Sequence, residues 1–288
     1  MHEIIRRFVF LFVMLSICTS SYSQNLKDLQ CKIKNLVLQG RYQLALDEIE
    51  KDRENIDILQ NNSRELFNIA FYKGYCLIAL SDYDVADTFL SKLSNQIITW
   101  KPSKQRNEYL ASLDYLKGTL YLSMNNFNGA NQLFMSSKSY FDYESCFDDS
   151  YVNILFSLAG VKLALGQKLK AKLYIDEAND ILSKTSKSSF WGVYCITLAI
   201  LYDEIGKREK AISILDNELQ KLTPDFAHNA VLQIKISLAY FYTLDGKYQQ
   251  AYDLLSDIEY GDNLWLYELK ASLSYLLKKG NVSQSILC

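Results

Sequence analysis

An alanine that recurs at nearly fixed distances constrains the fold of this chain more than any other feature. Each alanine follows, by five residues, a Gly, Ser or Asn that suits a tight turn between two helices. The alanines are Ala45, Ala86, Ala130, Ala171, Ala211 and Ala251. The turn residues are Gly40, Ser81, Asn125, Gly166, Gly206, Gly246 and, without a following alanine, Gly280. This pattern predicts one helical hairpin that is repeated along the chain.

The residues around each turn indicate how the paired helices pack. An aromatic residue stands two positions after four of the turns, at Tyr42, Tyr83, Phe127 and Tyr248. Lys168, Arg208 and Val282 interrupt this aromatic pattern. A small residue stands seven positions before five of the turns, at Gly74, Gly118, Ala159, Ala199 and Ala239. Small side chains let two helices approach closely, so we expect these positions and the recurring alanines to be buried contacts.

The third unit carries this pattern most completely, with Gly118, Tyr121, Asn125, Phe127, Ala130 and Phe134. Its order of small, aromatic, turn, aromatic, alanine and apolar residues resembles the tetratricopeptide repeat (TPR) family. The resemblance implies an all-α fold, a right-handed helical-hairpin solenoid of TPR type, with about six and a half repeats by this count of turns. Five of the six spacings between turns are 40 to 44 residues, whereas the family period is about 34. We therefore expect extended helices or connectors, and a related helical-hairpin superfamily stays open.

The N-terminus has the features of a secretory signal peptide. Arg6 and Arg7 precede an apolar run from Phe8 to about Cys18, and small residues follow at Ser21 and Ser23. The run is too short to span a bilayer, which takes about 20 residues. We expect residues 1–23 to be a signal peptide and residues 24–288 to be a TPR-like helical repeat domain without a membrane span. The expected location is the bacterial periplasm, although the same signal also permits secretion.

Charge and cysteine spacing exclude several function classes. The formal net charge is −2 and no long run of basic residues occurs, so we expect no nucleic acid partner. Five cysteines follow the signal peptide, at Cys31, Cys76, Cys146, Cys195 and Cys288. They are far apart and form no CxxC pair, which argues against a zinc site. We expect Cys31, Cys76 and Cys195 to be small core residues, and one disulfide stays open.

No pattern in the sequence predicts catalysis or a cofactor. His228 is the only histidine after the signal peptide, and we expect it in a solvated connector. The chain carries no GxGxxG, GxxxxGK or HExxH motif, so we expect no enzyme, no metal and no cofactor. The densest acidic and aromatic stretch, residues 140–151, contains Asp148 and Asp149. It can be a ligand-contacting or cation-binding connector, or Asp149 and Ser150 can cap a helix that begins near Tyr151; we favour the cap.

In the TPR family the first helices of the hairpins line a concave groove. The resemblance therefore implies that the exposed faces of first helices contact a protein or peptide partner. The candidate groove residues are Asn68, Tyr75, Tyr115, Thr119, Asn153, Gln233, Tyr240 and Thr243. Aromatic and amide groups suit peptide recognition, while the competing interpretation is that the tyrosines fill seams between units. The sequence does not identify the partner.

The last unit is short. A leucine-rich helix is expected over about 264–279, and only eight residues follow Gly280. Solenoid ends usually carry a polar cap, so either Ile286 and Leu287 fold over the core or the reading frame is truncated. Two hypotheses follow: an exported scaffold that binds a protein or peptide, or the sensory periplasmic domain of a TPR-containing transcriptional regulator or sensor kinase.

Overall fold

The structure is a computed structural model that describes residues 24–51, 64–144, 149–184, 191–221, 228–256 and 269–277. Within these ranges the regular structure is entirely helical. The chain forms two compact units, Met1–Lys184 and Thr185–Cys288. The expected signal peptide, residues 1–23, lies outside the described residues, and the single repeat domain over 24–288 stays a prediction. No helix in the described ranges is long and apolar enough to cross a bilayer.

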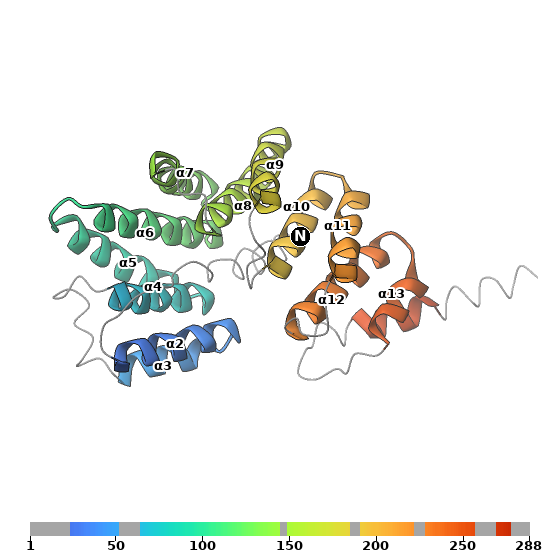
Figure 1. Ribbon diagram of the computed structural model, residues 1–288, viewed down its shortest axis with the longest axis horizontal. Coiled ribbons are helices and arrows are strands. Elements are labelled where there is room, and N and C mark those ends of the chain that lie inside the picture. Colours follow the sequence, from blue (N-terminus) through green and yellow to red (C-terminus); the bar gives the residue numbers. More distant parts are fainter. Residues whose placement is uncertain are drawn as a thin grey trace, which may run out of the picture. The chain divides into compact units, whose positions relative to one another are not determined.

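Successive helical hairpins build unit 1 (Figure 1). Even-numbered helices are the first helices of the hairpins, and odd-numbered helices are the second ones. Each first helix contacts the next first helix and the second helix before it. The helices are α2 (Gln24–Leu38), α3 (Tyr42–Lys51), α4 (Arg64–Ala79), α5 (Tyr83–Ile98), α6 (Lys104–Ser123), α7 (Phe127–Glu144), α8 (Asp149–Ala164) and α9 (Lys168–Lys184).

Two more hairpins form unit 2, and a further helical segment follows them. The helices are α10 (Trp191–Glu204), α11 (Arg208–Lys221), α12 (His228–Leu244) and α13 (Tyr248–Leu255). Residues 269–277 are also helical. Leu269 and Leu273 of this segment pack with Ile236, Ala251 and Leu255 in one core cluster. The described chain thus holds six hairpins and part of a seventh, which confirms the predicted helical-hairpin solenoid.

All six described turns close in the same way. The turn residue has a positive φ, including 67° at Ser81 and 61° at Asn125, the left-handed conformation that ends helices. The N–H of the next residue donates to a carbonyl five positions back, as from Asp82 to Leu77 (2.9 Å). The second helix then begins two residues after the turn, even where Lys168 or Arg208 replaces the aromatic residue. The turn backbone therefore sets the start of each second helix.

The small residues are the close contacts that the sequence predicts. All six recurring alanines are completely buried. At Gly118, an added Cβ would lie 2.6 Å from Cε1 of Phe134, and at Gly74 it would lie 2.7 Å from Cδ2 of Leu90. Both distances are far below ordinary carbon contacts of about 3.5–4.0 Å. At these glycines the backbone of the first helix therefore packs directly against a side chain of the second helix.

Long helices contribute to the long repeat period in unit 1. The helices α4 to α9 have 16 to 20 residues each. Pro102 falls in the connector between α5 and α6, and Pro224 lies outside the described residues. The N-cap of α6 is Ser103, whose Oγ accepts a hydrogen bond from the Arg106 N–H (3.1 Å).

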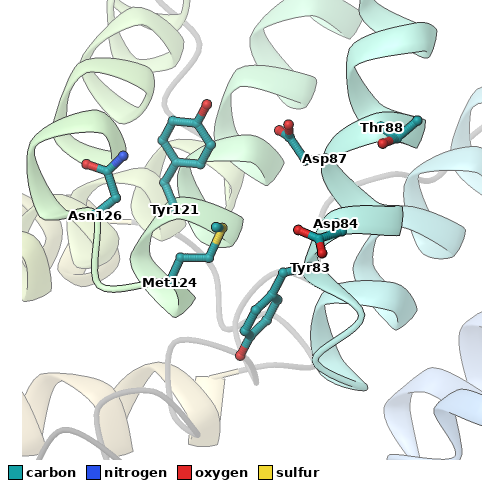
Figure 2. A pocket seen from close by; sticks show the side chains of 7 residues that line it. All are labelled: Tyr83, Asp84, Asp87, Thr88, Tyr121, Met124 and Asn126. Carbon is teal, nitrogen blue, oxygen red and sulfur yellow. The ribbon is translucent and has the colours of Figure 1, made fainter.

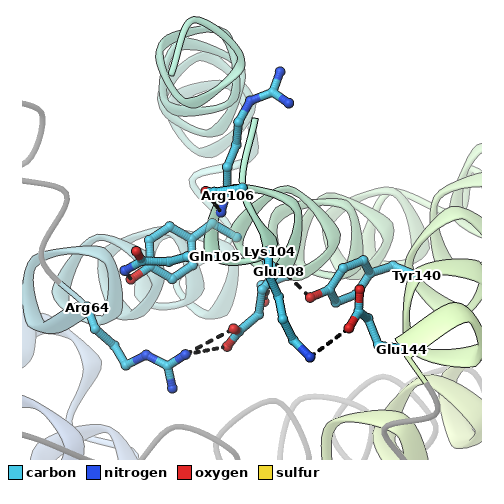
Figure 3. A network of polar contacts seen from close by, with 10 residues as sticks. Arg64, Lys104, Gln105, Arg106, Glu108, Tyr140 and Glu144 are labelled. Atoms are coloured by element: carbon cyan, nitrogen blue, oxygen red, sulfur yellow. Dashed lines mark hydrogen bonds and ion pairs between the residues drawn. The ribbon is translucent and has the colours of Figure 1, made fainter. Parts of the chain in front are cut away.

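A polar network links α4, α6 and α7 where α4 and α6 begin (Figure 3). Arg64 of α4 donates from Nη2 to both carboxylate oxygens of Glu108 of α6, at 2.9 Å each. Lys104 pairs with Glu144 of α7 (2.6 Å). The first pair joins consecutive hairpins and the second joins the two helices of one hairpin. Partly exposed pairs such as these each contribute only about 0–1 kcal/mol.

Candidate functional site

Five of the eight predicted groove residues are buried, so the expectation that they lie on exposed helix faces is wrong for unit 1. The five are Asn68, Tyr75, Tyr115, Thr119 and Asn153, with exposed fractions of 0–6%. They come from α4, α6 and α8, the first helices of three consecutive hairpins.

Seam packing explains the two tyrosines and the threonine. The Tyr75 ring meets the edge of Tyr42 from the preceding hairpin, with ring centroids 5.9 Å apart. Tyr115 packs on Phe134 (5.5 Å) and accepts a hydrogen bond from Ser157 of the next hairpin (3.4 Å). Burial raises the pKa of Tyr115 to about 12. Thr119 donates to the Tyr115 carbonyl within its own helix (3.1 Å).

The two asparagines are different, because no described contact explains their amide groups. Asn68 and Asn153 occupy the same repeat position, thirteen residues before their turns. Among the described residues, neither Oδ1 atom has a hydrogen-bond partner. An unsatisfied buried carbonyl costs about 1–3 kcal/mol. Because both asparagines are buried, neither is accessible to a partner in this structure.

In unit 2 the predicted residues are accessible on α12. Gln233 is exposed, and Tyr240 and Thr243 are partly buried. Spacings of seven and three residues place the three side chains on one face of the helix. Leu244, beside them at the end of α12, is 43% exposed. This face of a first helix, defined by Gln233, Tyr240, Thr243 and Leu244, is the candidate site, and we call it the α12 face.

A charged pair adjoins the α12 face. The Arg208 Nε donates to Asp203 Oδ1 (2.7 Å), and its Nη1 donates to the Leu244 carbonyl (3.3 Å). Burial, and then the nearby Asp203 carboxylate, raise the pKa of the Tyr240 phenol. Asp203 in α10 holds the repeat position that Thr243 holds in α12, three residues before the turn. This pair was not predicted from the sequence, although the repeat position that Asp203 shares with Thr243 was an available signal.

The acidic and aromatic stretch serves packing where it is described. The Tyr151 hydroxyl donates to Asp142 Oδ1 (2.6 Å) and Glu177 Oε1 (2.5 Å). Lys138 Nζ lies 5.0 Å from the Tyr151 ring centroid and 3.1 Å from Asp142. The pKa of Tyr151 is raised by burial and by both carboxylates. The helix α8 begins at Asp149, two residues before Tyr151 and thus near the predicted start, while Asp148 lies outside the described residues.

Predictions for the cysteines and the histidine are corrected in part. Cys76 and Cys195 are buried as predicted, but Cys31 on α2 is exposed, so the expectation that it is a core residue is wrong. Burial raises the pKa of Cys76 to about 12, which leaves it a protonated core thiol. Cys146 and Cys288 lie outside the described residues. His228 begins α12 instead of lying in a connector. No group of three His, Cys, Asp or Glu in the described ranges could hold a metal ion.

Comparisons with solved structures identify the architecture. TPR-like repeats assigned to a kinesin light chain of Podospora anserina have a TM-score of 0.55 and 16% identity, covering 74% of this chain and 98% of that one. BtubC (BKLC) from P. vanneervenii has a TM-score of 0.57 and 15% identity, covering 88% and 93%. The apo form of RapI has a TM-score of 0.64 and 11% identity, covering 92% and 74%. No protein-family model and no curated protein sequence matches this chain.

Proposed function

Because this chain has the fold of TPR-like repeat proteins, we propose that it is an exported scaffold that binds a protein or peptide through first-helix faces, and through the α12 face in particular. TPR-like folds support protein interaction in general, since stacked hairpins present extended surfaces. The α12 face adds the specific observation: its amide, aromatic and hydroxyl groups remain at least partly accessible, whereas the five predicted groove residues of unit 1 are buried.

The chemistry of the α12 face suits an extended peptide segment. The Gln233 amide can both donate to and accept from a peptide backbone. Tyr240 offers a large contact area at low entropic cost, because a partly buried ring has few conformations to lose. Leu244 supplies an apolar contact beside it. The Arg208–Asp203 pair holds the end of α12 against α10, which keeps this surface preorganised.

Export is the second part of the proposal. Its basis is the sequence of residues 1–23, with Arg6 and Arg7 before an apolar run and small residues at Ser21 and Ser23. The scaffold then acts outside the cytoplasm, with the periplasm as the preferred compartment.

Selection of a displayed peptide library on the immobilised full chain tests the binding surface. Affinities of the selected peptides are then compared between wild type, Gln233→Ala and Tyr240→Ala. We expect each change to weaken binding about tenfold or more, as for contact residues at an interface centre. Gln220→Ala in α11 and Tyr252→Ala in α13 are matched controls, because both residues are exposed on second helices. If the selected peptides bind both α12 variants as tightly as wild type but bind the control variants more weakly, the proposal is contradicted.

A further inference from the structure

A pocket of about 330 Å³ lies in unit 1, between the start of α5 and the turn that joins α6 to α7. Asp84 and Asp87 of α5 face Tyr121 of α6 and Met124, the residue that follows α6, across it, and the Tyr83 ring lies beside them (Figure 2). The two carboxylates are three residues apart, which places them on the same side of the helix. Neither has an ion pair or hydrogen bond with another described residue.

In two repeats of unit 2, a lysine of the same hairpin places its ammonium group over the tyrosine at the repeat position of Tyr121. Tyr121 stands four residues before its turn, and Tyr202 stands at the same position in unit 2. Lys210 Nζ lies 3.9 Å from the centroid of the Tyr202 ring and donates to its hydroxyl (2.8 Å). In the same way, Lys247 lies 5.8 Å from the centroid of Tyr242. A cation over this aromatic position is therefore a recurring feature of the fold.

The next junction in unit 1 shows the same preference with a different residue. Lys162 replaces the tyrosine there, and its Nζ donates to Asn131 Oδ1 (2.6 Å). Asn131 stands six residues after its turn, which is the repeat position of Asp87. In the following hairpin, the residue at the repeat position of Asp87 thus accepts a hydrogen bond from a lysine ammonium group.

At the Asp84–Asp87 pocket the chain provides no such cation. The repeat positions of Lys210 and Lys247 are held by Gly129 and Asn126. Asp84 and Asp87 instead place two carboxylates beside Tyr121, and no other repeat has acidic residues at both of these positions, three and six residues after the turn. The aromatic walls and the negative charge remain, so the pocket has the chemistry of a cation site whose cation must come from outside the chain.

The lining residues favour an organic cation over a metal ion. Two tyrosine rings and a thioether are poor ligands for Ca²⁺ or Mg²⁺, which require several oxygen ligands. The same groups are good contacts for a guanidinium or ammonium group with an aliphatic stem. The N-terminus of α5 contributes about half a positive charge, which two full negative charges outweigh.

We infer that this pocket binds an arginine or lysine side chain that a protein partner presents. The inference rests on the proposed function only for the source of the cation, because the α12 face contributes no residue to the pocket. Binding of a small cationic peptide can therefore be tested separately from binding at the α12 face.

Methionine methyl NMR gives a local test on the full chain. The sequence has four methionines, of which Met124 lines the pocket and Met135 accepts a hydrogen bond from Tyr174 at another place in unit 1. Met124→Leu and Met135→Leu assign the two resonances of the ¹³C-methyl-labelled protein. The probe is an acetyl-Gly-Arg-Gly-amide peptide, and its control contains citrulline, the uncharged isostere, in place of arginine.

We expect the arginine peptide to shift the Met124 methyl resonance saturably and to leave Met135 unchanged. Asp84→Asn and Asp87→Asn should each weaken binding about fivefold, since each removes one charge near the cation, and added salt should weaken it further. Retained folding of both variants is checked by the unchanged Met135 resonance. An equal shift with the citrulline peptide, no shift at Met124, or undiminished binding by Asp84→Asn and Asp87→Asn each overturns the inference.

Discussion

Enlarging Gly118 by one methyl group should destabilise unit 1, because no space exists for a Cβ atom. The added atom would lie 2.6, 2.7 and 3.1 Å from three carbons of the Phe134 ring. Phe134 is completely buried, and its ring packs on the nearly buried Tyr115 at 5.5 Å, so it cannot move alone. Overpacking of this kind costs about 1–3 kcal/mol, and three close carbons place it near the upper value.

Helix propensity acts in the opposite direction and must be subtracted. Alanine is more favourable than glycine inside a helix by about 1 kcal/mol. We therefore expect Gly118→Ala to lower the free energy of unfolding by about 2 kcal/mol. Gly74→Ala is the matched comparison, since its Cβ meets only the ends of flexible leucine side chains, Leu90 and Leu116. It should cost less than Gly118→Ala.

Urea unfolding followed by far-ultraviolet circular dichroism measures both changes. Phe134→Leu should relieve the clash, so the double variant Gly118→Ala/Phe134→Leu should be more stable than the sum of the single effects predicts. A Gly118→Ala protein at least as stable as wild type, or strictly additive effects in this cycle, would refute the reasoning.

Three further predictions concern buried polar groups and export. Tyr151→Phe should lower stability by about 1 kcal/mol, because Asp142 and Glu177 lose the hydroxyl whose one proton lies between them; an unchanged urea midpoint contradicts this. Burial raises the pKa of Asp114 despite the hydrogen bond from Ser136 (2.6 Å). The folded state therefore binds this proton more tightly than the unfolded state, and the contribution of Asp114 to the free energy of unfolding falls as pH rises. Asp114→Asn should then stabilise the protein at pH 7, with a gain that shrinks in acid; a gain independent of pH argues against it. Mass spectrometry of the protein from its native cells should find Gln24 at the N-terminus, and a chain that retains residues 1–23 refutes the predicted export signal.

The sequence predicts the repeat geometry well, because turns and close contacts depend on local chemistry. Ser81 and Asn125 adopt the left-handed conformation, like the glycines at the other turns. Ala130 and Ala211 are fully buried. In each case the residue type itself, a turn former or a methyl-sized side chain, carries the information that the structure uses.

Exposure of the first-helix faces is harder to predict, because periodicity gives the face of a helix but not the neighbours that cover it. Tyr75 and Tyr240 hold the same repeat position, six residues before the turn. Tyr75 is covered by Tyr42 of the preceding hairpin, whereas Tyr240 remains partly accessible. Likewise Asp84 reads as an ordinary acidic residue in the first turn of a helix. Only its position opposite Tyr121 marks it as part of a pocket.

Site-specific photo-crosslinking in native cells tests the central claim most directly. A photoreactive amino acid is placed at Gln233 on the α12 face or, as a control, at Gln220 on α11, both of which are exposed glutamines of unit 2. The account predicts a discrete covalent adduct with one protein from position 233 and none from position 220, with Tyr240→Ala reducing the adduct. Equal labelling from both positions, or an adduct from position 220 alone, would contradict a partner-binding role for this first-helix face.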